Sequence, residues 1–452
     1  MENNGAGMSP DMDLEDRLRD EEKGNNSNGI LRAPVNILSR ALASIRTSNK
    51  DNGPPPDGGL EAWCQIIWSH FTFCNTWGYV NSFGVFQTHY TQMLSETPST
   101  ISWIGSVQVF LLFSVGTLSG RASDAGFFKA VWGLGALLTV IGVFMASLST
   151  TYWQLFLSQG LCLGIGCGLM FCPMLSLIST YFSKYRSLAV GLAAAGSSTG
   201  GLVFPAVVKQ LLPQIGFPWT MRILGFITLA TLIPSFIFFK PRVPPRKGGP
   251  FVEWTAFADL SYTFFSVGMF FAFWGLYVAF FYIGSFARDI VGVDQATSIS
   301  LLLIINGAGM PARVLPNLLA DKHTGPVNLL IPIIFITSII LFCWVSVTTS
   351  SDVYAFSVFY GIFSAGIQSL FPASLTSLTV DLKKIGVRTG MVLTIVSFAS
   401  LTGSPIAGAL VQRGNGGYSY AQCFAAASMA VGGILVAMSR ICSTGFVLKA
   451  RM

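Results

Sequence analysis

Long apolar runs alternate with short polar connections from residue 62 to residue 442 of this chain. Each run is long enough to cross a bilayer as a helix, which takes about 20 residues. The pattern predicts an all-α membrane protein with twelve transmembrane helices. The expected helices cover residues 62–88, 100–120, 130–149, 153–178, 187–210, 219–239, 260–285, 297–320, 327–347, 353–379, 388–411 and 420–442.

The second half of the chain repeats landmarks of the first half. Four pairs of residues have nearly the same separation: Trp77 and Trp274 (274 − 77 = 197), Asp124 and Asp321 (197), Pro173 and Pro372 (199), and Pro205 and Pro405 (200). In both halves, two glycine-rich apolar helices flank a basic turn, which contains Lys184 in the first half and Lys383 in the second. A duplicated unit explains this repeat, so we expect two pseudo-symmetric bundles of six helices each.

The polar segments divide the chain further. We expect a disordered cytosolic N-terminal tail (1–56), a first bundle (57–239), a cytosolic linker (240–259), a second bundle (260–442) and a short cytosolic C-terminal tail (443–452). The N-terminal tail lacks the apolar stretch of a cleavable signal peptide, so we expect it to stay attached. Within it, residues 30–46 place apolar residues at helical spacing. This fits a short membrane-surface helix. The alternative is a weakly structured linker, because Pro34 interrupts the helical pattern.

Composition and charge agree with a membrane protein. Apolar residues make up 52% of the chain and charged residues 10%, with a mean hydropathy of +0.60, unlike a soluble domain. The net charge of +7 comes from basic residues scattered over short loops, so nucleic-acid binding is not expected. Loops after helices 2, 4, 6, 8 and 10 hold twelve Lys or Arg, against three in the opposite loops. This asymmetry predicts cytosolic termini. We expect the plasma membrane, with a vacuolar or other organelle membrane as the alternative.

The sequence contains no set of residues typical of a metal site, a cofactor site or a catalytic centre. Cys162, Cys167 and Cys172 are spaced five apart, which turns each away from the last on a helix. The glycines at 164, 166 and 168 lie in a spanning helix and follow no strand, so we reject nucleotide binding. We therefore expect no metal, no cofactor and no enzymatic activity.

A turn motif occurs once in each half. Gly-Arg-Ala-Ser-Asp at residues 120–124 follows helix 2, and Asn-Leu-Leu-Ala-Asp-Lys at residues 317–322 follows helix 8. A carboxylate at such a turn can cap the next segment and pair with basic residues of a neighbouring loop, which holds one closed state. This resembles the loop signature of the major facilitator superfamily. We expect Gly120, Asp124 and Asp321 to form that conformational motif; the alternative is an ordinary capped turn.

Two further stretches carry a narrower resemblance. Pro-Asp-Gly-Gly-Leu-Glu-Ala-Trp at residues 56–63 enters helix 1, and Tyr-Phe-Ser-Lys-Tyr-Arg-Ser-Leu-Ala-Val-Gly-Leu-Ala-Ala-Ala-Gly-Ser at residues 181–197 enters helix 5. They look like the two signatures of the monocarboxylate porter family. The likeness extends from Asp57 to Arg440, and the sequence as a whole resembles the fungal branch of that family. The resemblance implies the twelve-helix major facilitator fold and transport of organic anions or related small molecules, in animal members by proton symport.

The chain departs from this family at two charged positions. Proton-coupled members have a lysine in helix 1 where this chain has Asn81, and an aspartate four residues before a helix 8 arginine. The arginine matches as Arg313, but the aspartate position is Gly309. Two of the three charged groups that such coupling would use are therefore absent from these positions.

The membrane segments contain a small number of polar candidates for a substrate site. Arg313 lies eight residues before Asp321, about 12 Å into the membrane, where a guanidinium can hold a carboxylate or instead snorkel or bond to backbone. His70, with a free pKa near neutrality, is a candidate proton carrier or a structural tie. The expected substrate-binding residues are Arg313, His70, Trp77, Asn81, Asn306, Tyr277 and Gln368.

Together these features predict a transporter that moves a small organic anion, a monocarboxylate or a carboxylate-bearing metabolite, by alternating access. Transport would be facilitated or coupled to protons through His70. The expected partners are a small-molecule substrate, protons in the coupled case, and the lipid bilayer. The alternatives are an exporter of a secondary metabolite, an importer of a neutral vitamin such as riboflavin, and a nutrient sensor that does not transport.

Overall fold

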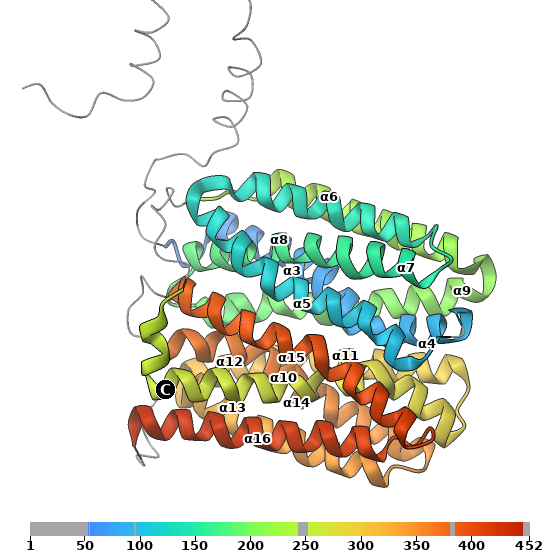
Figure 1. Ribbon diagram of the computed structural model, residues 1–452. Helices are drawn as coiled ribbons and strands as arrows, with labels where there is room; N and C mark the ends of the chain where they lie inside the picture. Colours follow the sequence, from blue (N-terminus) through green and yellow to red (C-terminus); the bar gives the residue numbers. More distant parts are fainter. Residues whose placement is uncertain (1–52, 54, 95, 243–251, 380–384, 446–452) are drawn as a thin grey trace, which may run out of the picture. The chain divides into compact units, whose positions relative to one another are not determined.

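The computed structural model describes residues 53, 55–94, 96–242, 252–379 and 385–445, all of them within one compact unit, Thr47–Met452. Within this part of the chain the regular secondary structure is helical, and the helices run side by side, α3 to α9 in the upper part of Figure 1 and α10 to α16 in the lower part. Most of the predicted N-terminal tail, part of the linker and most of the C-terminal tail lie outside the described residues.

The first half contains α3 (Gly59–Asn81), α4 (Phe83–Leu94), α5 (Pro98–Ala122), the π-helical turn η1 (Ser123–Phe127), α6 (Phe128–Ala146), α7 (Tyr152–Leu155), η2 (Phe156–Cys162), α8 (Leu163–Tyr181) and α9 (Arg186–Phe238). The second half contains η3 (Trp254–Ala258), α10 (Leu260–Phe286), η4 (Ala287–Val291), α11 (Gln295–Ala312), α12 (Leu315–Leu319), η5 (Ala320–Thr324), α13 (Pro326–Cys343), η6 (Trp344–Ser346), α14 (Ser350–Ser377), α15 (Ile385–Arg413) and α16 (Ser419–Thr444).

These elements make twelve membrane crossings. Nine helical stretches of the described chain are long and apolar enough to span a bilayer, but Pro98–Ala146 has 49 residues and Arg186–Phe238 has 53. Each of these two is long enough to cross twice, since one crossing takes about 20 residues. The remaining crossing is α3 with α4, whose polar side chains lower its hydropathy. The predicted twelve-helix all-α fold is confirmed.

Some helix boundaries differ from the prediction. The gap predicted between helices 5 and 6 (residues 211–218) contains the bend in α9, which changes direction at Gly216; the φ of 72° there is accessible to glycine without strain. The first predicted helix is divided at Ser82 into α3 and α4, and its second part continues to Leu94. A pattern of apolar residues does not register the division at Ser82, because both sides of it are apolar.

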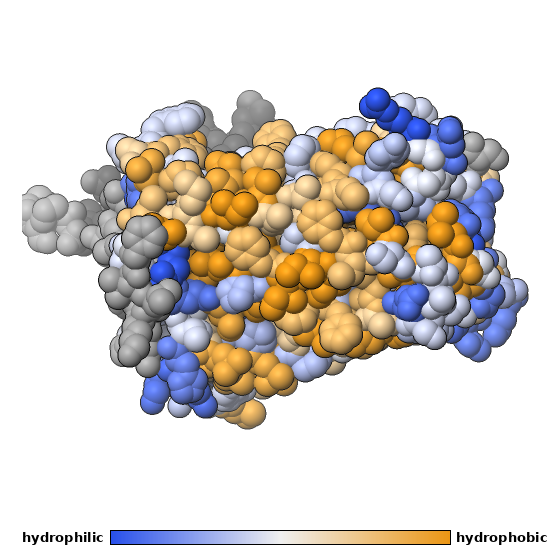
Figure 2. Space-filling model, turned by 90° about the horizontal axis from the view of Figure 1, so that it is seen from below, coloured by the Kyte–Doolittle hydropathy of each residue, from blue (hydrophilic) through white to orange (hydrophobic). Residues whose placement is uncertain are grey.

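The outer surface of the described helices matches a lipid environment. Large apolar side chains such as Leu137 (57% exposed) and Ile339 (61% exposed) face outward. Figure 2 shows hydrophobic side chains gathered in the middle of one face, with hydrophilic side chains toward both ends. Such an apolar zone is stable only where lipid covers it.

Small residues allow close helix packing inside the first half. A Cβ at Gly78 of α3 would meet the Cα of Gly200 of α9 at 2.6 Å, so any larger residue would push the two helices apart. This agrees with the role predicted for the small-residue helix, since helices in lipid associate through close backbone contact.

The two turn motifs have the same local structure. The π-helical turn Ser123–Phe127 joins α5 to α6, and the π-helical turn Ala320–Thr324 joins α12 to α13, at a separation of 320 − 123 = 197 residues. Gly120 lies in the last turns of α5, Asp124 in the first turn motif, and the backbone of Asp321 in the second; the Asp321 side chain lies outside the described part. The role predicted for these residues in holding a closed state stays a prediction.

Candidate functional site

A central cavity lies between the two halves. Its walls come from α3, α5, α8 and α9 of the first half and from α10, α14, α15 and the α11–α12 junction of the second. The lining residues are mostly apolar, and six are aromatic: Phe73, Trp77, Phe113, Phe171, Phe273 and Phe371. A mostly apolar lining with a few polar groups is typical of small-molecule sites.

Arg313 contributes the positive charge of this cavity's lining, and its side chain is 3% exposed. It follows the last residue of α11, at a junction where Pro311 precedes it and α12 begins two residues later. Its Nε donates to the Ser198 hydroxyl at 2.8 Å and a terminal nitrogen donates to Gln368 Oε1 at 3.3 Å. Both hydrogen-bond partners of the guanidinium are therefore neutral, and no Asp or Glu of the described residues forms an ion pair with it.

The backbone at Arg313 is also held in place. Its carbonyl oxygen accepts hydrogen bonds from Asn317 Nδ2 at 2.8 Å and from Ser369 Oγ at 2.6 Å. These contacts replace helical hydrogen bonds at the junction between α11 and α12, where proline lacks a donor. The guanidinium is thus presented to the cavity from a fixed backbone.

Three further predicted site residues lie beside Arg313. Trp77 and Gln368 line the cavity, and the Tyr277 ring stacks on Trp77 across the two halves, with centroids 6.4 Å apart and planes at 20°. Trp77 Nε1, the Tyr277 hydroxyl and Gln368 Nε2 are buried atoms without a hydrogen-bond partner among the described residues. Buried polar atoms normally have a partner, so these three atoms have unused capacity to bond a ligand. Asn81 Nδ2 and Oδ1 and Asn306 Oδ1 also lack a partner among the described residues.

The other three predicted site residues do not line this cavity. His70 is turned toward α9, where its ring nitrogens lie 3.1 Å from the Leu192 carbonyl oxygen and 3.0 Å from Thr199 Oγ1. A neutral imidazole satisfies both contacts by donating to the carbonyl and accepting from the hydroxyl. Asn306 Nδ2 donates to the Leu302 carbonyl of its own helix, and Asn81 is fully buried. Their substrate-binding role stays a prediction that the geometry does not favour.

The cavity extends toward one end of the helices, which we call the proximal end: the ends of α8 and α14 and the starts of α3, α9 and α15. Leu175, Val190, Leu375 and Thr389 line it there. The opposite, distal end is closed by contacts between the halves: Phe83 with Phe281 (centroids 4.7 Å apart), Ser99 Oγ to the Pro405 carbonyl (2.9 Å) and Lys209 Nζ to Ser300 Oγ (2.7 Å). The cavity is therefore sealed from the distal side.

Comparison with known families identifies this arrangement. The family model described as Major Facilitator Superfamily matches residues 70–386. The chain belongs to this superfamily. An MFS-type transporter of Gibberella zeae is 46% identical over 98% of this chain and 99% of its own length. MFS-type transporter dbaD of Emericella nidulans is 36% identical (88% of this chain, 90% of its own), and the Aspyridones efflux protein apdF of that organism is 37% identical (87% and 83%).

Membership of the superfamily settles the broad function. The protein is a multi-pass membrane transporter, which places a small molecule and the lipid bilayer among its partners, and the family does not consist of enzymes. Among the described residues, no group of three or more His, Cys, Asp or Glu could hold a metal ion.

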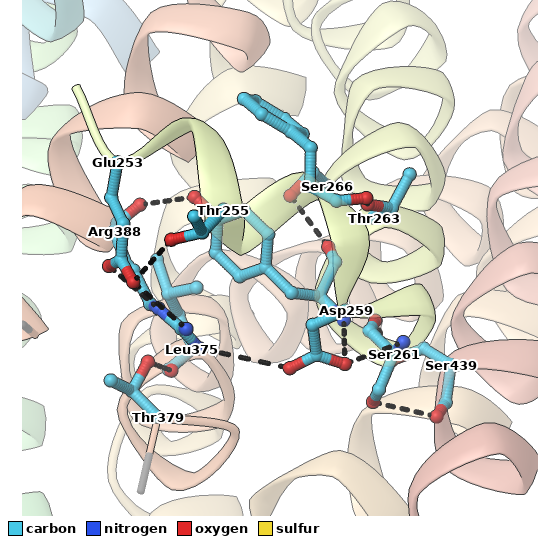
Figure 3. Close-up of polar contacts among 12 residues, drawn as sticks. Glu253, Thr255, Asp259, Ser261, Thr263, Ser266, Leu375, Thr379, Arg388 and Ser439 are labelled. Atoms are coloured by element: carbon cyan, nitrogen blue, oxygen red, sulfur yellow. Dashed lines mark hydrogen bonds and ion pairs between the residues drawn. The ribbon is translucent and has the colours of Figure 1, made fainter. Parts of the chain in front are cut away.

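The transporter also contains an ion-pair cluster at its proximal end that sequence reasoning missed. Arg388, next to the cavity residue Thr389, pairs with Glu253 at 3.3 Å and with Asp259 at 3.8 Å (Figure 3). The cluster joins the start of α15 to the segment before α10. The acidic residues were visible in the sequence, but 388 − 253 = 135 residues separate the partners, so no local spacing links them.

The two porter-like signatures meet in the first half. Asp57 Oδ1 accepts hydrogen bonds from the backbone N–H groups of Ser183 (2.6 Å) and Lys184 (2.7 Å), just before α9 begins. The hydrogen bond from Ser183, and to a smaller extent that from Lys184, lowers the pKa of the Asp57 carboxyl. Asp57 in the first half and Glu253 in the second thus each connect the segment before the first helix to the region where the fifth helix begins.

Proposed function

We propose that this transporter moves a small organic anion across the membrane, with Arg313 as the group that binds the negative charge. The observation that carries this proposal is the position of Arg313: almost fully buried, in the cavity wall, and hydrogen-bonded to two neutral side chains. Leaving an arginine in such a place without a counterion costs several kcal/mol of solvation free energy. An anion in the cavity offsets this cost through bidentate hydrogen bonds.

Alternating access follows from the contacts between the halves. The described state is closed at the distal end, where Phe83 packs on Phe281 and Lys209 bonds to Ser300. Release to the distal side requires these contacts to break while the proximal ends of α8, α9, α14 and α15 close over the cavity. Repeated halves moving against each other around one central site supply this motion.

Export is the direction that the name of one relative favours. This similar protein is named the Aspyridones efflux protein apdF. With the cytosolic termini that charge asymmetry predicts, the cavity faces the cytosol, which is the side from which an exporter is loaded. The proposal is therefore export of a carboxylate-bearing or otherwise acidic metabolite, from a branch resembling the monocarboxylate porters, at the plasma membrane.

Proton coupling through a carboxylate in the cavity is not part of the proposal. None of the residues that line the cavity is Asp or Glu, and His70 is bonded to α9 instead of facing the cavity. We propose facilitated transport, driven by the gradient of the anion.

The test uses wild-type protein and Arg313→Gln in liposomes loaded with a panel of labelled organic anions and neutral vitamins. We expect anion efflux from wild type and loss of at least about 90% of it in Arg313→Gln, at equal reconstituted protein, since removing a charge-assisted contact costs about 1.5–3 kcal/mol. Undiminished anion flux in the variant, or flux confined to a neutral vitamin such as riboflavin, contradicts the proposal.

A further inference from the structure

We infer that the anion is a flat, conjugated acid with acceptor oxygens beside its acidic group, rather than a short aliphatic monocarboxylate. This inference rests on the proposed function and concerns the same cavity. It depends on two features: the aromatic walls of the cavity and the number of hydrogen-bond donors around Arg313.

The walls are formed by aromatic rings from both halves. The ring of Trp77 packs edge-on against the rings of Phe113 and Phe171, with centroids 5.2 Å and 5.6 Å apart. The ring centroids of Phe113 and Phe273 are 5.9 Å apart. Phe273 in turn lies 5.2 Å from Phe371. A flat conjugated ligand gains from ring contacts of the stacked or edge-to-face kind in addition to the area it buries.

More hydrogen-bond donors surround the Arg313 guanidinium than a single carboxylate contact would use. Arg313 is accompanied by the unpartnered Gln368 Nε2, whose side-chain oxygen accepts a hydrogen bond from the guanidinium. The buried hydroxyl of Tyr277 is also without a partner among the described residues. Trp77, stacked on Tyr277, adds an unpartnered indole N–H that can only donate. Trp77 and Tyr277 are 6% and 2% exposed, so water does not reach them freely.

These donors select the head group of the ligand. A carboxylate with an adjacent hydroxyl or carbonyl, or an enolate flanked by carbonyl groups, presents several acceptor oxygens in one plane. Such a head satisfies the guanidinium and the neighbouring donors together, while its conjugated ring lies among the phenylalanines. A neutral ring leaves the arginine without a counterion, and a saturated ring loses the aromatic contacts.

The experiment measures binding of four probes to purified full-length protein by isothermal titration. The probes are 3-hydroxy-2-naphthoate, the neutral 2-naphthamide, the saturated decahydro-2-naphthoate and lactate. We expect 3-hydroxy-2-naphthoate to bind at least tenfold more tightly than each of the others. In Phe171→Leu, which stays apolar but loses a ring, we expect this preference over the saturated acid to fall at least threefold.

The matched control is Phe342→Leu on α13, where the ring is 46% exposed on the outer surface. It makes the same chemical change away from the cavity and should leave all four affinities unchanged. Equal affinity of wild type for the saturated acid or for lactate overturns the inference but leaves the proposed function intact. Equal affinity for the neutral amide overturns both, and so does binding of none of the probes. The wild-type comparison holds whether or not a variant folds.

Discussion

The Arg388 Nε lies 3.3 Å from the Glu253 Oε2, and this ion pair joins the start of α15 to the segment that precedes α10 (Figure 3). The two side chains are 14% and 10% exposed, so both charges are largely withdrawn from water. Next to them, Ser261 and Ser439 exchange side-chain to backbone hydrogen bonds that connect α10 to α16. The proximal ends of three helices of the second half are thus held together beside the cavity.

Glu253→Gln is expected to destabilise the transporter by about 3 kcal/mol, because removing one partner leaves a nearly buried guanidinium with weaker pairing. The measurement is the thermal midpoint of purified protein. Lys240→Gln provides a matched control, since the Lys240–Glu61 pair spans 3.9 Å between side chains that are 63% and 57% exposed. Its effect should stay below about 1 kcal/mol. Similar midpoints for the two variants would contradict this account of the cluster.

Asp57→Asn is expected to lower the thermal midpoint at neutral pH. Asp57 has a φ of 52°, which asparagine adopts readily, so the substitution mainly removes the charge that strengthens the bonds from Ser183 and Lys184. Because folding lowers the pKa of this carboxyl, the stabilisation is complete above its unfolded pKa of about 3.9 and is lost as the pH falls through the lower folded value.

The check on Asp57 is a series of thermal midpoints of both proteins from pH 7 downward. The gap between wild type and Asp57→Asn should stay constant down to about pH 5 and then shrink as the carboxylate of the wild type is protonated. A gap that grows toward acid pH would show that the carboxylate does not stabilise the folded protein.

Gly84→Ala is expected to weaken closure at the distal end. A Cβ at Gly84 would collide with the carbonyl oxygen of Phe280 in the other half, which overpacks the closed state by about 1–3 kcal/mol. A cysteine introduced at Ser300 should therefore react faster with a water-soluble thiol reagent. Gly307→Ala is the control, because its Cβ would meet only Leu202 at 3.6 Å. Equal labelling rates in both backgrounds would count against distal closure by this contact.

The sequence predicted the fold and part of the candidate site. Apolar run length predicted the twelve crossings, and the cost of a buried charge singled out Arg313, which does line the cavity. The helical spacing of His70, Trp77 and Asn81 did not reveal which neighbour each faces: α9 bonds His70, whereas Trp77 faces the cavity. Facing depends on how α3 packs, and a single helix does not encode that.

Contacts between distant segments were also beyond the sequence pattern. Most of the phenylalanines that form the cavity wall look like any other apolar residue of a membrane helix. The ion pairs of Arg388 join residues far apart along the chain, and Ser198 is one small residue within a small-residue helix. What distinguishes these residues is the approach of two helices, which only the assembled fold provides.

Ser198→Ala tests whether Arg313 acts from a fixed position. The Ser198 hydroxyl accepts from Arg313 Nε at 2.8 Å, is fully buried and does not belong to the cavity lining, so its loss leaves both the charge and the cavity walls in place. A hydrogen bond to a charged group contributes about 1.5 kcal/mol or more, which corresponds to a rise in the KM for an anion of about tenfold with little change in maximal rate.

Ser266→Ala is the matched control, because that buried hydroxyl donates to the Tyr262 carbonyl of its own helix at 2.7 Å. If both serine variants give the KM of wild type, Arg313 does not need Ser198 to bind the anion. If Ser198→Ala lowers the maximal rate but leaves the KM unchanged, the hydrogen bond acts on the conformational change instead of on binding.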